Sequence, residues 1–345
     1  MTSSKLHLRQ LTRDQALDLT LPDKLEYFHH IVVKHPRMTH VLGELLPLSG
    51  RYAGTDIVLL IGPTGVGKSS TVAAAESAIK AKFNAEMQAD SGLVPVVSIE
   101  APASGEQKFS WRILYTKLLD GLSEPLINRK SVTYVEEGRW RMNTTSGGST
   151  VAALRLATEK ALEHRGTRVV VIDEAAHLLT SCRESQLASH MNALKSLSNV
   201  GGVTLVLVGS YDLFRLLTLS GQLARRSAVL HMQRYSNTKD DRTSFRRALR
   251  TLQNRLPIKD IPDLDPFSDQ LQETCVGGIG VLKDTMTRAL SLTLENGGKW
   301  RHDYLIRALL SKRQVASILE ETLDGEKSLD VAVYGGRDKS ELSLG

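Results

Sequence analysis

Residues 57–69 read IVLLIGPTGVGKS, an unbroken apolar run followed at once by a glycine-rich segment that ends in a lysine and a serine. The apolar run predicts a strand buried on both faces of a parallel sheet. Residues 62–69 fit the pattern GxxxxGK[ST], and residues 69–83 continue in a helical pattern. A strand, this loop and a helix in succession predict a phosphate-binding loop, with a glycine-rich turn carrying a surface lysine as the alternative.

Each residue type in the loop has a chemical reason. Glycines let the backbone curl so that its N–H groups face phosphate oxygens at the start of a helix. Lys68 is expected to reach the β- and γ-phosphates, and the Ser69 hydroxyl is expected to ligate Mg²⁺. The sequence therefore predicts an ATP site made of Gly62, Pro63, Thr64, Gly65, Val66, Gly67, Lys68, Ser69 and Ser70.

A second apolar run, residues 169–172, ends in the carboxylates Asp173 and Glu174. Ligands collect at the carboxyl ends of strands in doubly wound sheets. Asp173 is expected to hold Mg²⁺, directly or through water, and Glu174 to activate the attacking water as general base. Acids placed at a strand end for solubility are the alternative. The spacing after the phosphate loop, with room for one intervening strand, favours the site and separates this class from kinases and GTPases.

Further apolar runs alternate with helical patterns in the first two thirds of the chain. The strands are expected at residues 56–61, 94–99, 169–172 and 203–208, and the helices at 69–83, 110–122, 151–163 and 184–197. Such alternation predicts an α/β fold with a doubly wound parallel sheet of about five strands. Ser210 follows the run at 203–208, where a hydroxyl suits sensing of the γ-phosphate or the lytic water; an ordinary strand-end serine is the alternative.

Beyond about residue 235 only helical patterns follow, at residues 241–256, 266–275, 281–296 and 303–323. They predict an all-helical lid. The expected domains are an N-terminal helical lead-in (1–50), a nucleotide-binding α/β domain (51–235), the lid (236–323) and a flexible C-terminal tail (324–345).

The order of these elements resembles the TnsC/TniB family of AAA+ transposition regulators over residues 25–310. The resemblance rests on the phosphate loop, the extra strand, residues 172–175 (IDEA), 207–210 (LVGS), 222–226 (QLARR) and 277–280 (GGIG). It implies an ATP-dependent DNA-binding oligomer that forms a ring or a helical filament. Such an oligomer links a target-site selector to a transposase and is disassembled through ATP hydrolysis.

The resemblance also implies roles for single residues. In AAA+ proteins, a basic pair at the place of Arg225 and Arg226 presents an arginine finger to the ATP of the neighbouring subunit, with Arg226 preferred here. Pairing of these arginines with a helix dipole is the alternative. Family members contact duplex backbone at positions that match Lys108 and Thr150; a solvated loop charge and a plain helix N-cap are the alternatives.

A basic and aromatic cluster, Arg139, Trp140 and Arg141, could reinforce a DNA groove or be ordinary surface charge. The lid departs from the AAA+ pattern, because Val281 stands where a sensor arginine is expected. Either Lys283 replaces that arginine or the contact is missing.

Composition is compatible with this interpretation. The net charge of +6 and the isoelectric point near 9.2 suit a polyanionic partner, although many basic proteins bind none. The two cysteines, Cys182 and Cys275, lack CxxC spacing and suit a reducing compartment. With no apolar run long enough to cross a membrane and no signal-peptide pattern, we expect a bacterial cytoplasmic protein.

Two other functions remain open. An AAA+ scaffold switch would control a protein complex without touching DNA. A replication initiator or clamp-loader relative would use the same core, but an initiator is expected to append a helix-turn-helix or winged-helix domain, whereas the helices after residue 235 resemble a lid alone. Helicase or unfoldase activity is disfavoured, because the sequence has no pore-loop aromatic motif and no second ATPase module.

Overall fold

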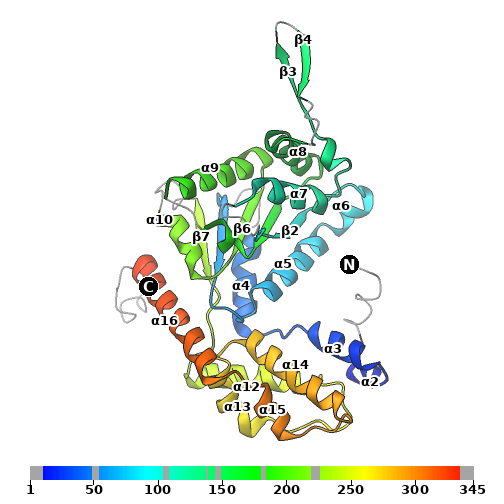
Figure 1. The fold of residues 1–345 in the computed structure, drawn as a ribbon, viewed down its shortest axis with the longest axis vertical. Coiled ribbons are helices and arrows are strands. Elements are labelled where there is room, and N and C mark those ends of the chain that lie inside the picture. The colour runs from blue at the N-terminus through cyan, green and yellow to red at the C-terminus, as the bar shows by residue number, and fades with distance from the viewer. Residues whose placement is uncertain are drawn as a thin grey trace. The chain divides into compact units, whose positions relative to one another are not determined.

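The computed structural model describes residues 11–48, 54–103, 109–136, 139–143, 149–179, 184–218 and 226–334. Contacts divide the chain into two compact units. Unit 1 comprises Met1–His40, Gly62–Gly67 and Met232–Gly345, and unit 2 comprises Val41–Ile61 and Lys68–His231. Figure 1 labels elements of both units where there is room.

Unit 2 is built on a five-stranded parallel sheet with the order β2-β5-β6-β1-β7. Its strands are β1 (Ile57–Ile61), β2 (Val96–Glu100), β5 (Val169–Asp173), β6 (Thr204–Gly209) and β7 (Ser227–His231). The predicted doubly wound parallel sheet is therefore confirmed. The strand that follows the phosphate loop in sequence, β2, lies at the edge of the sheet, and β6 lies between β1 and β5.

Helices cover both faces of this sheet, which explains why every residue of β1 and β6 is buried. They are α5 (Lys68–Lys82), α6 (Asn84–Ala89), α7 (Trp111–Gly121), α8 (Val151–His164), α9 (Glu184–Gly201) and α10 (Arg215–Thr218), with 3-10 turns η1 (Ile127–Arg129), η2 (Ala175–Leu179) and η3 (Tyr211–Phe214). From β1 the chain crosses to the edge strand β2, and it then returns through β5 and β6. Because these connections run in opposite directions along the sheet and are right-handed, α5 lies on one face and α7 and α9 lie on the other. Figure 1 shows α8 and α9 across the strands from α5.

A two-stranded antiparallel hairpin, β3 (Val132–Glu136) and β4 (Arg139–Asn143), forms a separate sheet in unit 2. Figure 1 shows it extending away from α7 and α8. The sequence analysis did not predict it, although β-branched and aromatic residues on either side of Glu137-Gly138 are typical of a hairpin.

Unit 1 is helical and has its own core. It contains α2 (Arg13–Ala16), α3 (Leu21–His29), α12 (Lys239–Gln253), η4 (Asp265–Phe267), α13 (Ser268–Thr274), α14 (Ile279–Glu295), α15 (His302–Ala308) and α16 (Lys312–Tyr334), while α4 (Pro36–Leu48) starts in this unit and continues in unit 2. Phe28 of α3, Phe245 of α12 and Met286 of α14 are fully buried in one apolar cluster. The N-terminal helices therefore pack with the lid helices.

The C-terminal part of unit 1 differs from the expectation at two points. The single helix predicted at residues 303–323 is two helices, because the chain leaves helical geometry at Leu309 after α15. Helix α16 continues through Tyr334, so residues 324–334 are helical where a flexible tail was expected. Thr322, Gly325 and Leu329 are buried at helical spacing. Residues 335–345 of that expected tail lie outside the described part of the chain.

Candidate nucleotide site

The glycines of the phosphate loop occupy positions that other residues would strain or crowd. Gly65 and Gly67 have φ of 73° and 106°, in the region that disfavours side chains. A Cβ at position 62 would lie 2.4 Å from the carbonyl oxygen of Met232. The loop backbone therefore curls as a phosphate cradle requires, and α5 begins at Lys68, one residue before the predicted start of this helix.

The carboxyl edge of the unit 2 sheet gathers the predicted polar residues. Strand β5 ends at Asp173, β6 ends at Gly209 just before Ser210, and Gly209 pairs with Ile61 at the end of β1. In the sheet, β6 lies between β1, which leads into the loop that carries Lys68, and β5, which ends at Asp173. Ser210 follows β6 and therefore stands at the end of the middle strand of the three. Ser210 Oγ donates to Asp212 Oδ2 at 3.4 Å.

Glu174 has a strained backbone at the end of β5. Its φ of 50° is in the left-handed region, which costs a non-glycine residue on the order of 1 kcal/mol. The Glu174 N–H donates to Asp173 Oδ1 at 2.9 Å, and its side chain is exposed.

The residues expected to hold Mg²⁺ are compatible with that ion. Ser69 and Asp173 offer a hydroxyl and a carboxylate, and Mg²⁺ prefers oxygen ligands and commonly keeps several waters beside phosphate oxygens. Among the described residues, no group of three or more His, Cys, Asp or Glu side chains could hold a metal.

Arg226 lies at the opposite edge of the sheet. It precedes β7, its carbonyl accepts from the N–H of Asp56 at 2.9 Å, and its Nη1 donates to Asp56 Oδ2 at 3.3 Å. Five strand residues separate it from the carboxyl edge, about 16 Å at 3.3 Å per residue. The Arg226 side chain is 52% exposed. Arg225 lies outside the described residues.

The predicted DNA contacts are only partly described. Lys108 lies outside the described residues. Thr150 is the N-cap of α8, where its Oγ1 accepts from the Ala153 N–H at 3.1 Å, and the role of N-cap named as the alternative is thus observed. Arg139 and Arg141 lie in β4, paired with Glu136 and Tyr134, and only their backbone is described.

The ends of α7 and α8 that flank these positions are joined. Arg112 Nη1 donates to the Ser149 carbonyl at 2.6 Å, one residue before Thr150. Phe109, the neighbour of Lys108, has its ring centroid 5.4 Å from that of Trp111 and 5.6 Å from that of His190. The residues next to Lys108 and Thr150 are therefore anchored to the same side of unit 2.

In the lid, Val281 and Lys283 take different places. The Val281 N–H donates to the Gly65 carbonyl at 3.2 Å, and its side chain is buried. Lys283 Nζ donates to the carbonyl of His29, the last residue of α3. In this structure Lys283 therefore caps a neighbouring helix.

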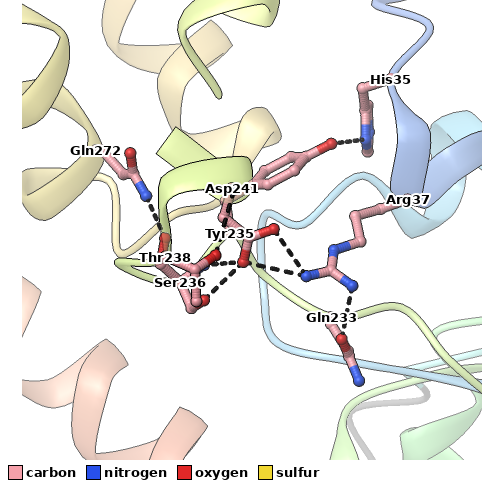
Figure 2. Close-up of polar contacts among 8 residues, drawn as sticks. All are labelled: His35, Arg37, Gln233, Tyr235, Ser236, Thr238, Asp241 and Gln272. Carbon is pink, nitrogen blue, oxygen red and sulfur yellow. Dashed lines mark hydrogen bonds and ion pairs between the residues drawn. The ribbon is translucent and has the colours of Figure 1, made fainter. Parts of the chain in front are cut away.

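A polar network next to the phosphate loop was missed (Figure 2). His35 Nδ1 and the Tyr235 hydroxyl lie 3.0 Å apart, and a Cβ at Gly67 would lie 3.9 Å from His35 Nε2. Burial, reinforced by the charge of Arg37, lowers the pKa of His35 to about 4. The only sequence signal was a histidine before Pro36, inside the segment expected as a helical lead-in.

Arg37 extends the network toward the segment that leads into α12. Its Nη2 donates to both carboxylate oxygens of Asp241, at 3.0 and 3.1 Å, and its Nη1 donates to Gln233 Oε1 at 2.7 Å. Asp241 Oδ2 also accepts from the N–H and hydroxyl of Ser236, whose carbonyl accepts from Gln272. The carboxylate is thus held by charged and neutral donors together.

Comparison with known proteins supports the fold. Residues 51–217 match the family model described as an AAA domain. No curated protein sequence matches the chain. In the described part of the chain, no helix has both the length and the apolar character needed to cross a membrane.

Three solved structures of archaeal proteins are similar to this chain. For the ORC1 protein of Aeropyrum pernix in complex with DNA, the TM-score is 0.54 at 16% identity, over 86% of this chain and 68% of that one. For Cdc6p from Pyrobaculum aerophilum, the TM-score is 0.51 at 15% identity, over 83% of this chain and 67% of that one. For the ORC2 protein of Aeropyrum pernix in ADPNP and ADP complexes, the TM-score is 0.50 at 16% identity, over 80% of this chain and 66% of that one.

The chain thus spans about two thirds of the length of these proteins, and identities this low show the fold alone. The strand order β2-β5-β6-β1-β7, the phosphate loop after β1 and the family match agree with one another. This chain has the AAA+ P-loop fold.

Proposed function

We propose that this protein is an ATP-hydrolysing AAA+ protein that assembles on duplex DNA and links target-site selection to a transposase, with hydrolysis driving disassembly. The observation that carries the nucleotide part is the gathering of polar residues where β5 and β6 end, beside the strand that leads into the phosphate loop. Parallel sheets bind ligands at this edge.

Each residue has a role in this proposal. The loop N–H groups and Lys68 bind the phosphates, while Ser69 and Asp173 hold Mg²⁺. The ion supplies charge neutralisation on the phosphates. Glu174 accepts a proton from the attacking water, and Ser210 offers a hydroxyl to the γ-phosphate or to that water.

The place of Arg226 in the sheet supports oligomer formation. An arginine at the opposite edge of the sheet from its own Asp173 cannot reach the phosphates bound there. Its side chain is half-exposed while it is paired with Asp56, so a second subunit would have to draw it away from that carboxylate. We therefore assign Arg226 as the finger that stabilises negative charge on the neighbour's ATP, in a ring or a helical filament.

The DNA part rests on fewer observations. The predicted contacts Lys108 and Thr150 flank the joined ends of α7 and α8, and Arg139 and Arg141 stand on the β3–β4 hairpin. The net charge of +6 favours a polyanion. The similar ORC1 protein of Aeropyrum pernix was solved in complex with DNA, which supports a DNA partner here.

A second candidate, a relative of replication initiators, is favoured by the similarity to ORC1 and Cdc6p. Both candidates use duplex DNA and ATP. They differ in partner, because the transposition regulator must bind a transposase and a target selector. The scaffold switch differs from both in that it leaves DNA untouched.

The decisive experiment is electron-microscope imaging and sedimentation of the purified protein with random-sequence duplex, with and without a slowly hydrolysed ATP analogue, at two salt concentrations. Regular assemblies that need both duplex and nucleotide, and that weaken at high salt, are expected. Lys108→Glu should abolish duplex binding and leave nucleotide binding intact.

Lys160→Glu is the matched control, because this exposed lysine lies about 15 Å along α8 from Thr150 at 1.5 Å per residue. It should bind duplex almost as wild type does. Assemblies indifferent to duplex would contradict the DNA function and favour the scaffold switch. Binding confined to one duplex sequence would favour the initiator.

A further inference from the structure

The phosphate loop and the lid helix α14 meet through their backbones within unit 1. The Gly65 carbonyl oxygen accepts hydrogen bonds from the N–H of Gly280 at 2.7 Å and from the N–H of Val281 at 3.2 Å. Gly280 and Val281 belong to the first turn of α14, whose N–H groups have no partners inside the helix. One loop carbonyl therefore satisfies two of these donors.

This approach depends on glycine at both ends. A Cβ at position 280 would lie 2.6 Å from the Gly65 oxygen, and a Cβ at position 65 would lie 2.4 Å from Val281 Cγ2. Such distances are shorter than real Cβ contacts, so any larger residue must push loop and helix apart. The sequence pattern GxxxxGK[ST] requires glycine at positions 62 and 67 but gives no reason for Gly65 or Gly280.

The contact fixes which way one loop peptide faces. The Gly65–Val66 peptide is trans, so its C=O and N–H point in opposite directions. With the carbonyl held by α14, the Val66 N–H points away from α14. Glycine at φ of 73° would otherwise tolerate the flipped peptide, which would aim the carbonyl dipole at bound phosphate.

We propose that Gly280 is a positioning residue for nucleotide binding: its N–H, with that of Val281, holds the Gly65 carbonyl so that the Val66 N–H faces the phosphates. This inference rests on the proposed ATP function. The lid is then linked to the nucleotide by main-chain hydrogen bonds. Such a link needs no arginine at position 281. It is also compatible with the observed hydrogen bond from Lys283 Nζ to the carbonyl of His29 at the end of α3.

The test compares two glycine-to-alanine changes inside helices. Gly280→Ala should weaken binding of a fluorescent ATP analogue at least tenfold, measured by anisotropy. Gly43→Ala in α4 is the matched control, because a Cβ there meets nothing within 4 Å. Both changes gain the same helix propensity, and the control should bind within twofold of wild type.

Thermal unfolding of each variant separates misfolding from mispositioning. If Gly280→Ala fails to fold, hydrogen exchange on the wild-type protein decides: nucleotide should slow exchange of the Gly280 and Val281 amides. Wild-type protein that binds no ATP analogue would overturn the proposed function itself. Wild-type binding together with a folded Gly280→Ala of equal affinity, or amide exchange indifferent to nucleotide, would overturn the positioning role alone.

Discussion

His35 Nδ1 lies 3.0 Å from the hydroxyl oxygen of Tyr235, although 200 residues separate the two in the chain. Both side chains are buried, with 6% and 3% of their surface exposed. Desolvation also raises the pKa of Tyr235, so both groups are neutral near pH 7. The N-terminal segment and the segment leading into α12 are thereby joined by an uncharged hydrogen bond inside unit 1.

The pH dependence of stability follows from His35. Its pKa is about 4 in the folded protein and 6.5 in the unfolded chain, so the unfolded state binds the proton first as the pH falls. The contribution of His35 to the unfolding free energy should be constant above pH 6.5, decline between 6.5 and about 4, and change no further below that. At about 1.4 kcal/mol per pKa unit, the total loss is on the order of 3 kcal/mol.

Urea unfolding of wild type and His35→Gln at several pH values checks this. Glutamine can keep a hydrogen bond to Tyr235 but does not titrate, so its profile should be flatter between pH 6.5 and 4. Parallel profiles for the two proteins would show that other groups control acid stability.

The Arg37–Asp241 pair should contribute to stability, because its carboxylate is only 13% exposed and has three donor groups. A double-mutant cycle with Arg37→Ala and Asp241→Asn should give a coupling of about 1 to 3 kcal/mol. The matched control is the exposed pair Arg301 and Asp303, joined at 2.9 Å, whose cycle should show no measurable coupling. Equal coupling in both cycles would contradict the importance of burial.

Glu174→Gln should lower the turnover number for ATP by about 100-fold or more, since a general base typically contributes that much. Affinity for ATP should stay close to wild type, because Gln preserves the size of the side chain. Steady-state phosphate release and analogue binding measure the two effects. Glu163→Gln, an exposed position near the end of α8, serves as control and should change neither. Near-normal turnover by Glu174→Gln would refute the assignment.

Arg226 should act between subunits. Arg226→Ala and Glu174→Gln should each be almost inactive alone, because one lacks the finger and the other the base. In a mixture of the two variants, the intact ATP site of an Arg226→Ala subunit can face the intact finger of a Glu174→Gln subunit. Phosphate release by the mixture should therefore exceed that of either variant. No recovery on mixing, in assemblies shown to contain both, would move the finger role to Arg225 or to the same subunit.

Local sequence patterns predicted the elements that hold the nucleotide. Apolar runs gave β1, β5 and β6 to within one or two residues, and helical spacing gave α5, α7 and α8. Gly62 to Ser69 and the Asp173–Glu174 pair were placed correctly at strand ends, because a strand, its loop and the next helix are neighbours in the chain. Their chemical roles stay predictions.

Other features were missed, some of them although the sequence carried a local signal. Residues 324–334 were interpreted as a tail because their composition is polar. They are helical in the structure, and Thr322, Gly325 and Leu329 are buried at helical spacing. The hairpin β3–β4 has ordinary strand residues, but their pairing depends on register across a turn. The pairing of His35 with Tyr235 leaves no periodic signal at all.

The sequence by itself determined the phosphate loop, the carboxylate pair and the α/β class, since these depend on residue types at fixed short spacings. Only the tertiary structure decided that β6 lies between β1 and β5, that α2 and α3 share a core with the lid helices, and that Gly280 meets Gly65. The physical reason is that burial and hydrogen bonding between distant segments are settled by packing, which acts across the whole fold and leaves no local pattern in the chain.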